Sequence, residues 1–361
     1  MRSHVRTIIV LAVAVLLIAL FLHNVDLWSV LTAILHAQPE WLALSLATML
    51  VNLAIRALRW QYLLAPLGHT SFMNSFRATA VGFAASSVLP ARAGEVIRPY
   101  FLARQAPPGQ KGRMTATGAF ATIILERLLD TVTVLILLAS FVFVFGKDLA
   151  GVNPTGFALV KWAGASAAAV AIAALAVLFV LAGDPARLGR TMTRLEQVVP
   201  SALAGVIAKI AEKFARGLGA IREPGRLLIA LAWSFPLWLS ICLGIWSVAV
   251  AFRFAIPFTG SFLLLALLVL GVAVPTPGAV GGFHEAFRVG ATMFYAAPQD
   301  AAVGAAIVLH LFSILPSLLL GLFFAAQEGL NVGGMRRLAD QAQQGQPALT
   351  NNAHGSTLNA Q

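Results

Sequence analysis

The sequence has 361 residues, of which 59% are hydrophobic and only 11% are charged, and its mean hydropathy is +0.85. This composition excludes an ordinary soluble domain and predicts an all-α polytopic membrane protein. The net charge of +11 has a membrane explanation, because basic loops face anionic lipids on the cytoplasmic side. The charge therefore gives no reason to expect nucleic-acid binding.

Six apolar runs approach the roughly 20 residues that a helix needs to cross a bilayer. Arg2 and Arg6 precede the first run, which we interpret as an uncleaved helix and not as a signal peptide. We expect full crossings at residues 7–22, 41–56, 119–145, 160–182, 227–252 and 301–325.

Two further apolar runs are too short to cross. The run 78–89 stops at Pro90, and the run 262–274 stops at Pro275. At about 1.5 Å per residue, each reaches little beyond the middle of a bilayer. Pairs of broken half-helices are typical of substrate sites in membrane transporters. The predicted turns contain Pro90 and Gly94 in the first case, and Pro275, Pro277, Gly278, Gly281 and Gly282 in the second.

The distribution of Lys and Arg predicts the orientation. With a cytoplasmic N-terminus, the basic segments 56–113 and 183–226 lie inside, and the segment 23–40, which has no Lys or Arg, lies outside. This arrangement satisfies the positive-inside rule and places both termini in the cytoplasm. The basic residues left on the outer side are Lys147, Lys161, Arg253 and Arg288.

This topology requires both short runs to be re-entrant, the first opening to the cytoplasm and the second opening outward. The halves then form an inverted repeat, with repeat A at about 5–145 and repeat B at about 160–326 in one membrane domain, 1–330. An alternative interpretation makes 262–296 a pair of short crossings.

We expect the linker 183–226 to be cytoplasmic and amphipathic, lying on the membrane or packed on the protein. The segment 331–361 is too polar to bury a core, and we expect a disordered cytoplasmic tail.

Three ionisable residues, Glu126, Arg127 and Asp130, lie inside the predicted crossing 119–145. Glu126 and Asp130 are four residues apart and share one face of a helix. Charges at this depth are costly and usually face a cavity or another part of the protein. The alternative interpretation is a neutralised cluster that only fixes this helix to the neighbouring hairpin.

More polar residues follow the break at Pro90. Arg92 and Arg98 could hold a phosphate, because guanidiniums match its oxygens, and Glu95 lies between them. They could instead be simple markers of the cytoplasmic side. Arg56, Arg59 and Trp60 end the second crossing, where snorkelling basic groups beside an interfacial Trp are the simpler interpretation.

The second half offers fewer candidates. Glu285 can pair with Arg288 on the returning half-helix, and we expect Glu285 to mirror Glu95. His310 lies within the last crossing, where it is either a packing residue or part of a proton relay. The sequence contains no phosphate-binding loop of the P-loop type and no metal-spaced Cys or His cluster. We therefore expect no metal, no cofactor and no ATP-driven pumping, and no nucleophile beside a base is visible.

The chain resembles the transmembrane, flippase-like domain of lysylphosphatidylglycerol synthases and its free-standing relatives. The resemblance covers roughly residues 5–330 and implies re-entrant inverted repeats that handle a lipid in the bacterial inner membrane. Full synthases also carry a soluble domain that transfers an aminoacyl group from tRNA, whereas a short polar tail follows here, so we do not expect an enzyme. The resemblance rests on Arg56-x-x-Arg59-Trp60, Leu89-Pro-x-Arg92-x-Gly94-Glu95-x-x-Arg98, Glu126-Arg127-Leu-Leu-Asp130 and Pro277-Gly278-x-x-Gly281-Gly282-x-x-Glu285.

The leading hypothesis is a translocator of an anionic phospholipid or a lipid-linked intermediate. Arg92 and Arg98 would hold the phosphate, and the path would be lined by Glu95, Glu126, Arg127, Asp130 and Glu285. A second hypothesis is a proton-coupled transporter of a small anion, with Glu95, Glu126, Glu285 and His310 as relay groups. A third is a non-catalytic partner of lipid- or envelope-modifying enzymes that binds them through 183–226.

Overall fold

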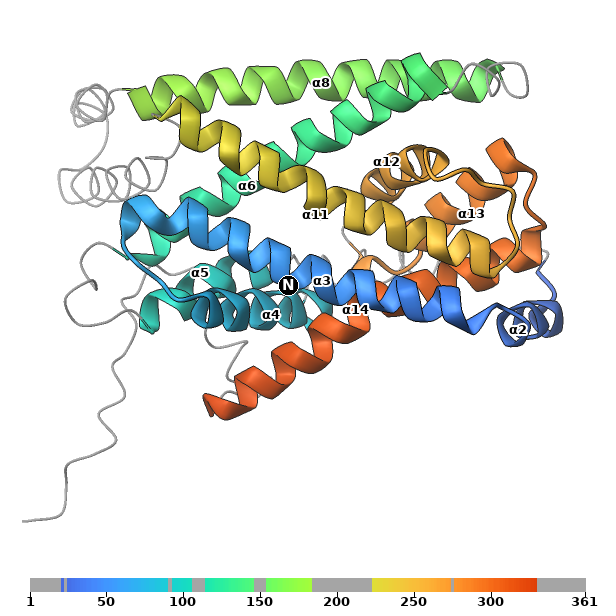
Figure 1. The fold of residues 1–361 in the computed structure, drawn as a ribbon, viewed down its shortest axis with the longest axis horizontal. Coiled ribbons are helices and arrows are strands. Elements are labelled where there is room, and N and C mark those ends of the chain that lie inside the picture. Colours follow the sequence, from blue (N-terminus) through green and yellow to red (C-terminus); the bar gives the residue numbers. More distant parts are fainter. Residues whose placement is uncertain are drawn as a thin grey trace, which may run out of the picture.

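The computed structural model describes residues 21–22, 25–89, 93–105, 114–145, 154–183, 223–273 and 276–329. In these residues the chain forms helices and no strands, and the long helices run side by side (Figure 1). The long helices are α3 (Pro39–Leu64), α6 (Ala116–Ser140), α8 (Pro154–Gly183), α11 (Pro224–Ala251) and α14 (Gln299–Gln327). The shorter elements are α2 (Leu27–Leu35), η1 (Ala65–Leu67), α4 (Phe72–Val88), α5 (Gly94–Arg104), η4 (Phe141–Phe145), α12 (Gly260–Ala273), η6 (Pro277–Ala279) and α13 (Gly282–Tyr295).

Four described helices are long and apolar enough to cross a membrane, which confirms a membrane protein built of helices. They contain the predicted crossings 41–56, 119–145, 227–252 and 301–325. The predicted crossing 160–182 lies within α8, and the crossing 7–22 lies outside the described residues except at its end. The four helices extend over Pro39–Leu67, Ala116–Val144, Gly225–Ala251 and Gln299–Gln327.

Polar side chains at the helix starts explain several boundaries. The Ser71 hydroxyl accepts a hydrogen bond from the Asn74 N–H, and the Thr115 hydroxyl accepts one from the Gly118 N–H at 3.1 Å. These caps satisfy backbone donors that the first turns of α4 and α6 leave free. Asp26 caps α2, where the hydrogen bond from the Ser29 hydroxyl is the main cause that lowers the pKa of its carboxyl group.

The short helices form two hairpins at opposite ends of the long helices, α4 with α5 and α12 with α13 (Figure 1). As the run lengths predict, α4 ends at Val88 and α12 ends at Ala273. At 17 and 14 residues they are about 25 and 21 Å long, short of a roughly 30 Å hydrocarbon core. Between α12 and α13 the chain turns through Gly278 and Gly281, both with positive φ.

The two hairpins pack internally through pairs of glycines. A Cβ on Gly94 would lie 1.7 Å from the Gly82 carbonyl oxygen, so the backbones of α4 and α5 touch. The second hairpin repeats the contact, because a Cβ on Gly282 would lie 2.2 Å from the Gly271 carbonyl oxygen. The hairpins also meet each other, since the end of α4 packs against η6. The end of α4 and η6 therefore lie close together.

Helices α3 and α11 form the central antiparallel pair. The Ser45 hydroxyl donates to the Gly244 carbonyl oxygen at 3.0 Å, and the Asn52 amide donates to the Leu237 carbonyl oxygen at 2.8 Å. Buried apolar side chains form the largest cluster around α11, α12, α13 and α14, and smaller clusters around α3, α4, α5 and the first half of α6. The pair α3–α11 therefore joins the two hairpins into one core.

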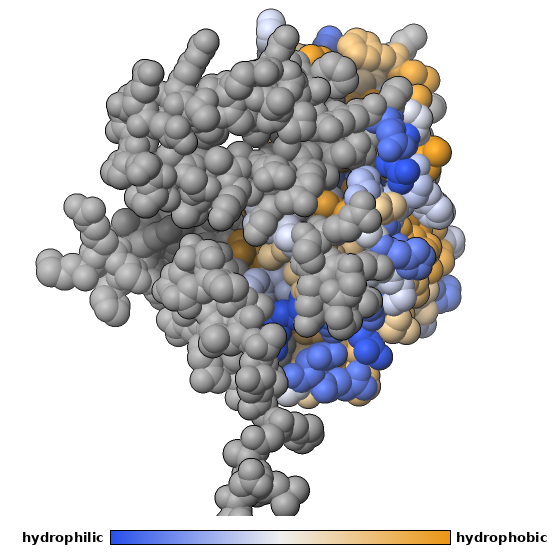
Figure 2. Space-filling model, turned by 90° about the vertical axis from the view of Figure 1, so that its left-hand side faces the viewer, coloured by the Kyte–Doolittle hydropathy of each residue, from blue (hydrophilic) through white to orange (hydrophobic). Residues whose placement is uncertain are grey.

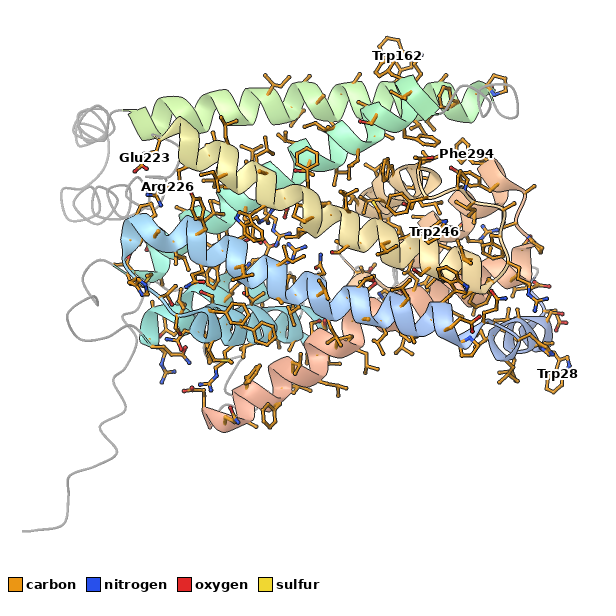
Figure 3. All side chains as sticks on the ribbon, viewed as in Figure 1. Trp28, Trp162, Glu223, Arg226, Trp246 and Phe294 are labelled. Atoms are coloured by element: carbon orange, nitrogen blue, oxygen red, sulfur yellow. The ribbon has the colours of Figure 1, made fainter. Side chains whose placement is uncertain are left out.

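The outside of the bundle fits a lipid environment. Large apolar side chains are exposed on the long helices, including Leu159 at 70% and Val170 at 70%. Trp28 and Trp162 point away from the bundle (Figure 3), as is typical of side chains at a membrane interface. Hydrophilic side chains are visible instead on the end of the bundle seen in Figure 2. Glu223 and Arg226, at the start of α11, lie at this end (Figure 3).

Some predicted features fall outside the described residues. These are Pro90, Arg92 and Pro275, the tail 331–361, and nearly all of the linker 183–226 with its amphipathic helix. They remain predictions. The division into repeats A and B and the exact number of crossings also remain predictions.

We predict that Gly94→Ala destabilises the first hairpin, because the added methyl group would have to displace the backbone of α4 at Gly82. The expected loss in free energy of unfolding is about 1–3 kcal/mol. Gly225→Ala is the matched control, since a Cβ there would meet nothing within 4 Å. Thermal unfolding of both variants in detergent measures the effect. Equal melting temperatures for the two variants would contradict the close packing of α4 on α5.

Candidate functional site

Helices α3, α5 and α6 bring seven ionised side chains together inside the protein. Glu126 and Arg59 are fully buried, and Arg56, Arg98 and Asp130 are at most 6% exposed. Arg127 and Glu95 are about one-third exposed and form the edge of the group. We call this group the charged cluster; its members are Arg56, Arg59, Glu95, Arg98, Glu126, Arg127 and Asp130.

One carboxylate oxygen is the centre of the charged cluster. Arg98 Nη1 donates to Glu126 Oε1 at 3.1 Å, and this is the shortest of its four ion pairs. Three more guanidiniums, those of Arg56, Arg59 and Arg127, each lie 3.5 Å from the same oxygen. Since these arginines come from α3, α5 and α6, Glu126 connects the first hairpin to two long helices.

Asp130 connects the charged cluster to α11. Its Oδ1 atom accepts a hydrogen bond from Arg59 Nη1 at 2.6 Å and another from the indole N–H of Trp238 at 2.9 Å. Arg59 Nη1 also donates to the Ser234 hydroxyl at 2.7 Å. The Oδ2 atom of Asp130 lies 3.5 Å from the Nη1 atom of Arg56 and 3.5 Å from the Nη1 atom of Arg127. Asp130 is therefore held from both repeats of the predicted fold.

The charges of the cluster do not cancel. Its described members are four guanidiniums and three carboxylates, which leaves one net positive charge in the interior. Several buried polar atoms also make no hydrogen bond among the described residues, namely the Nε and Nη2 atoms of Arg59 and of Arg98, together with Glu126 Oε2 and Asp130 Oδ2, although Arg59 Nη2 lies 3.5 Å from Glu126 Oε1. A buried donor without a partner costs roughly 1–3 kcal/mol, and more when it is charged. An anion with several oxygens would satisfy both the charge and these donors.

Aromatic rings position two of the arginines. The guanidinium of Arg98 lies 3.8 Å from the centre of the Trp60 ring, and that of Arg56 lies 5.3 Å from the centre of the Phe83 ring. The Trp60 indole N–H in turn donates to the Thr122 hydroxyl at 3.0 Å. These contacts keep the guanidiniums in place without occupying their N–H groups.

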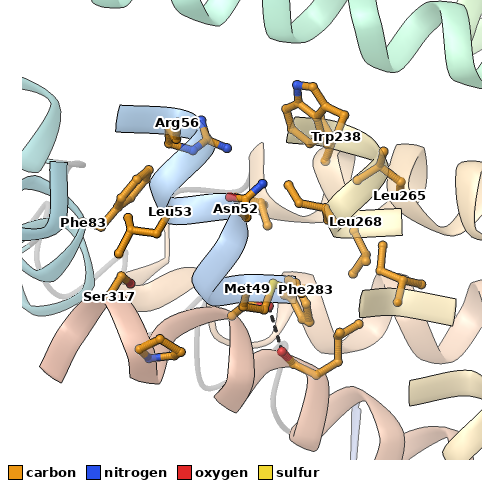
Figure 4. Close-up of a pocket in the computed structure, with 17 residues that line it drawn as sticks. Met49, Asn52, Leu53, Arg56, Phe83, Trp238, Leu265, Leu268, Phe283 and Ser317 are labelled. Carbon is orange, nitrogen blue, oxygen red and sulfur yellow. Dashed lines mark hydrogen bonds between the residues drawn. The ribbon is translucent and has the colours of Figure 1, made fainter. Parts of the chain in front are cut away.

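A cavity of about 260 Å³ adjoins the charged cluster (Figure 4). It lies between α3, α4, α11, α12, α13 and α14, and 13 of its 17 lining residues are apolar. Arg56 is the one charged residue among the described residues of its wall, and it lies at the same end as Trp238, whereas Met49 and Phe283 lie at the other end. The cavity therefore has one cationic end and walls that are mainly apolar.

The candidates of the second hairpin lie apart from the charged cluster. Glu285 pairs with Arg288 on α13 through a hydrogen bond of 2.9 Å from Nε. His310 lies close to the Gly278 carbonyl oxygen, 2.8 Å from its Nε2 atom, and its ring is 4.4 Å from that of His284. No contact of Glu285 with the charged cluster is found among the described residues. The pair of histidines instead holds the turn of η6 against α14.

One interpretation from the sequence changes with the structure. Arg56, Arg59 and Trp60 do not snorkel, because all three are buried in the protein and contact other helices. The alternative of an ion-paired cluster that fixes α6 to the neighbouring hairpin agrees with the pairs Arg98–Glu126 and Arg127–Glu95. The predicted members Arg92, Pro90 and Pro275 lie outside the described residues, as does the side chain of Pro277.

Sequence reasoning missed Ser234 and Trp238, which contact Arg59 and Asp130 from α11. The available signal was their spacing of four residues on one helix face, within an otherwise apolar run. In the described part of the chain, no group of three or more His, Cys, Asp or Glu side chains could hold a metal ion. Among the described residues, the arrangement presents guanidinium N–H groups of the kind that bind anions.

We predict that Glu126→Gln destabilises the protein by about 3–5 kcal/mol, because it leaves the four guanidiniums of the cluster, three of them buried, with two carboxylates. Glu285→Gln breaks one partly exposed pair and should cost about 0–1 kcal/mol. Thermal or denaturant unfolding of the purified variants in detergent compares them. The central role of Glu126 would be contradicted if both variants unfolded like the wild type.

The comparison with known families agrees with this geometry. No curated protein matches the chain. The family model of the lysylphosphatidylglycerol synthase TM region matches residues 7–321, which include all seven members of the charged cluster and both hairpins. The chain therefore belongs to the family of the lysylphosphatidylglycerol synthase transmembrane region.

Proposed function

We propose that this protein moves an anionic lipid, or a lipid-linked anionic head group, between the two leaflets of a membrane. The observation that supports the proposal best is the charged cluster, with its net positive charge and the N–H groups of Arg59 and Arg98 that make no hydrogen bond among the described residues. A phosphate has oxygens on several sides and can accept from both guanidiniums at once. Ionisable groups inside a membrane protein usually mark the path of a substrate.

Family membership supports a lipid substrate. The family is named after enzymes that make lysylphosphatidylglycerol, a phospholipid, and the part that this chain matches is their membrane region. Phosphatidylglycerol derivatives carry a phosphate between the head group and the glycerol. A site rich in Arg within a membrane domain suits such a phosphate, whichever group lies beyond it. The lipid class proposed here is therefore an anionic phospholipid or a lipid-linked phosphate.

The pairwise packing of the helices favours an inverted repeat. In the first half, α5 packs on α6 and α4 packs on α14. In the second half, the corresponding contacts are α13 on α14 and α12 on α6. The glycine contacts match Gly82 with Gly271 and Gly94 with Gly282. We propose that repeat A, about 5–145, and repeat B, about 160–326, lie in opposite orientations. Two hairpins that open to opposite sides can give a substrate alternating access.

We propose that the two repeats have different roles. When the repeats are aligned on these glycines, Glu95 is level with Phe283, and not with Glu285, because Glu95 directly follows Gly94 and Phe283 directly follows Gly282. Arg98 is then level with Ala286. The first hairpin therefore carries charge at positions where the second carries apolar side chains. We propose that the head group binds at the first hairpin and that the second hairpin closes the path.

Glu126 provides a way to release the head group. Its Oε1 atom is shared by four guanidiniums, and only the pair with Arg98 is as short as 3.1 Å. An incoming phosphate can replace Glu126 as the partner of Arg98 or Arg59 while the other arginines keep the carboxylate neutralised. Binding and release then exchange partners within the cluster and leave no charge unpaired.

A proton-coupled transporter of a small anion is the second candidate. The observation that favours it is the contact between His284 and His310 beside the turn of η6, which adds two titratable groups to the interior. Such a transporter would accumulate a soluble anion in vesicles with a proton gradient. A lipid translocator would move lipid without that gradient, so the two functions predict different results in the same vesicles.

We predict that Arg98→Gln and Arg59→Gln each reduce lipid translocation by about tenfold or more, the loss expected for one charge-assisted hydrogen bond. The assay follows fluorescent phosphatidylglycerol in reconstituted vesicles, using an added quencher that cannot cross the membrane. Arg226→Gln is the matched control, because Arg226 pairs with Glu223 at the end of the bundle and lies outside the charged cluster.

The proposal would be contradicted if vesicles with the wild-type protein moved lipid no faster than empty vesicles. It would also fail if Arg226→Gln reduced the rate as much as Arg98→Gln. Measuring the melting temperature of each variant separates a loss of transport from a loss of folding.

We predict that the two turns are reached from opposite sides of the membrane. In a Cys242→Ala background, Ala93→Cys and Thr276→Cys should react with a membrane-impermeant maleimide from the cytoplasmic and the outer side, respectively. Labelling of both positions from one side would rule out the inverted arrangement.

A further inference from the structure

We propose that the apolar cavity beside Arg56 receives one hydrocarbon chain of an anionic amphiphile, so that the protein binds part of the lipid's tail as well as its head group. The inference rests on the proposed function and specifies its substrate class. It concerns the cavity of about 260 Å³ between the two hairpins, which the head-group site alone does not explain.

The walls of the cavity fit a hydrocarbon chain. Leu265, Leu268 and Val269 of α12 line one side, and Phe83 of α4 lies on the opposite side (Figure 4). Val269, which lines the cavity, is also 40% exposed, so the cavity can be reached from the surface of the bundle. A chain that left the bilayer for this cavity would keep an apolar environment along its length.

The uncharged polar groups in the wall have their hydrogens engaged within the protein. The Asn52 amide donates to the Leu237 carbonyl oxygen and to the Ser240 hydroxyl, at 2.8 and 3.0 Å. The hydroxyl groups of Ser313 and Ser317 each donate to a carbonyl oxygen of α14. A buried water needs about two to four polar partners. The cavity offers few free donors, and it therefore suits a hydrocarbon chain better than a chain of waters.

Arg56 determines the charge of the amphiphile. Its Nη1 atom lies 3.5 Å from Glu126 and 3.5 Å from Asp130, which makes it a member of the charged cluster and a wall of the cavity at once. The polar end of a chain in the cavity therefore meets a guanidinium. An anionic group is attracted there and a quaternary ammonium group is repelled.

The volume limits the number of chains. Pockets that enclose a whole drug-sized ligand measure about 300–1,000 Å³, and this cavity is slightly smaller. It has room for a segment of one chain and not for both chains of a diacyl lipid. The second chain of a phospholipid would remain in the bilayer while the first chain and the phosphate are bound.

Photocrosslinking with decyl phosphate that carries a diazirine at its far end tests this inference on the full chain in vesicles. The expected crosslinks, mapped by mass spectrometry, fall on Leu265, Leu268 or the facing residues of α11. Leu268→Trp fills the cavity and should reduce these crosslinks by about tenfold, the effect of excluding about two methylene groups. Leu270→Trp is the matched control, because Leu270 is 55% exposed on the same helix.

Two further probes keep the test independent of folding defects. Leu268→Ala enlarges the cavity and should raise crosslinking by a dodecyl phosphate probe severalfold relative to the decyl probe. The decyl trimethylammonium analogue should crosslink only to exposed faces of the helices. Equal labelling by the cationic and anionic probes, or equal effects of Leu268→Trp and Leu270→Trp, would overturn the inference.

The outcome can be separated from that of the proposed function. Crosslinks in the cavity of a protein that moves no lipid would support the inference about the chain and contradict translocation. Translocation by the wild type without any crosslink in the cavity would overturn the inference and leave the proposed function standing.

Discussion

Burial of Glu126 is the constraint on which the rest of this structure depends. A carboxylate with no exposed surface inside a membrane protein has to be paired, because neither lipid nor water can stabilise it there. Glu126 is paired four times over, by guanidiniums of α3, α5 and α6. The ion pairs therefore decide where α5 lies, and with it the whole first hairpin.

The close contact of Gly82 with Gly94 makes this pairing possible. The backbones of α4 and α5 touch there, so the two helices of the hairpin are close together. Arg98 on α5 can then pair with Glu126 on α6. The ring of Trp60 then supports the guanidinium from the other side at 3.8 Å. The packing of Gly82 on Gly94 thus places Arg98 in the charged cluster. We propose that the net positive charge of this cluster, and its N–H groups without a hydrogen bond, bind the anion.

Much of the fold follows from the sequence, because run length and helix breakers act locally. The ends of α4 and α12 could be predicted from Pro90 and Pro275, and the shared face of Glu126 and Asp130 from their spacing. The contacts of Trp238 and Asn52 could not, since their partners lie more than 100 residues away. The burial of Arg59 could not be predicted either, because a snorkelling arginine and a buried, paired arginine can have the same neighbours in the sequence. The cavity was hidden for a similar reason: its apolar residues resemble those that face lipid.

The central claim is that the charged cluster selects an anionic lipid. Native mass spectrometry of the protein released from a membrane of known composition measures this most directly, because it identifies the lipids that stay bound. Our account predicts one anionic lipid retained well above its share of the membrane in the wild type, and loss of that enrichment when Arg98 is replaced by Gln. Bound lipids that simply match the composition of the membrane, or that are mainly zwitterionic, would contradict it.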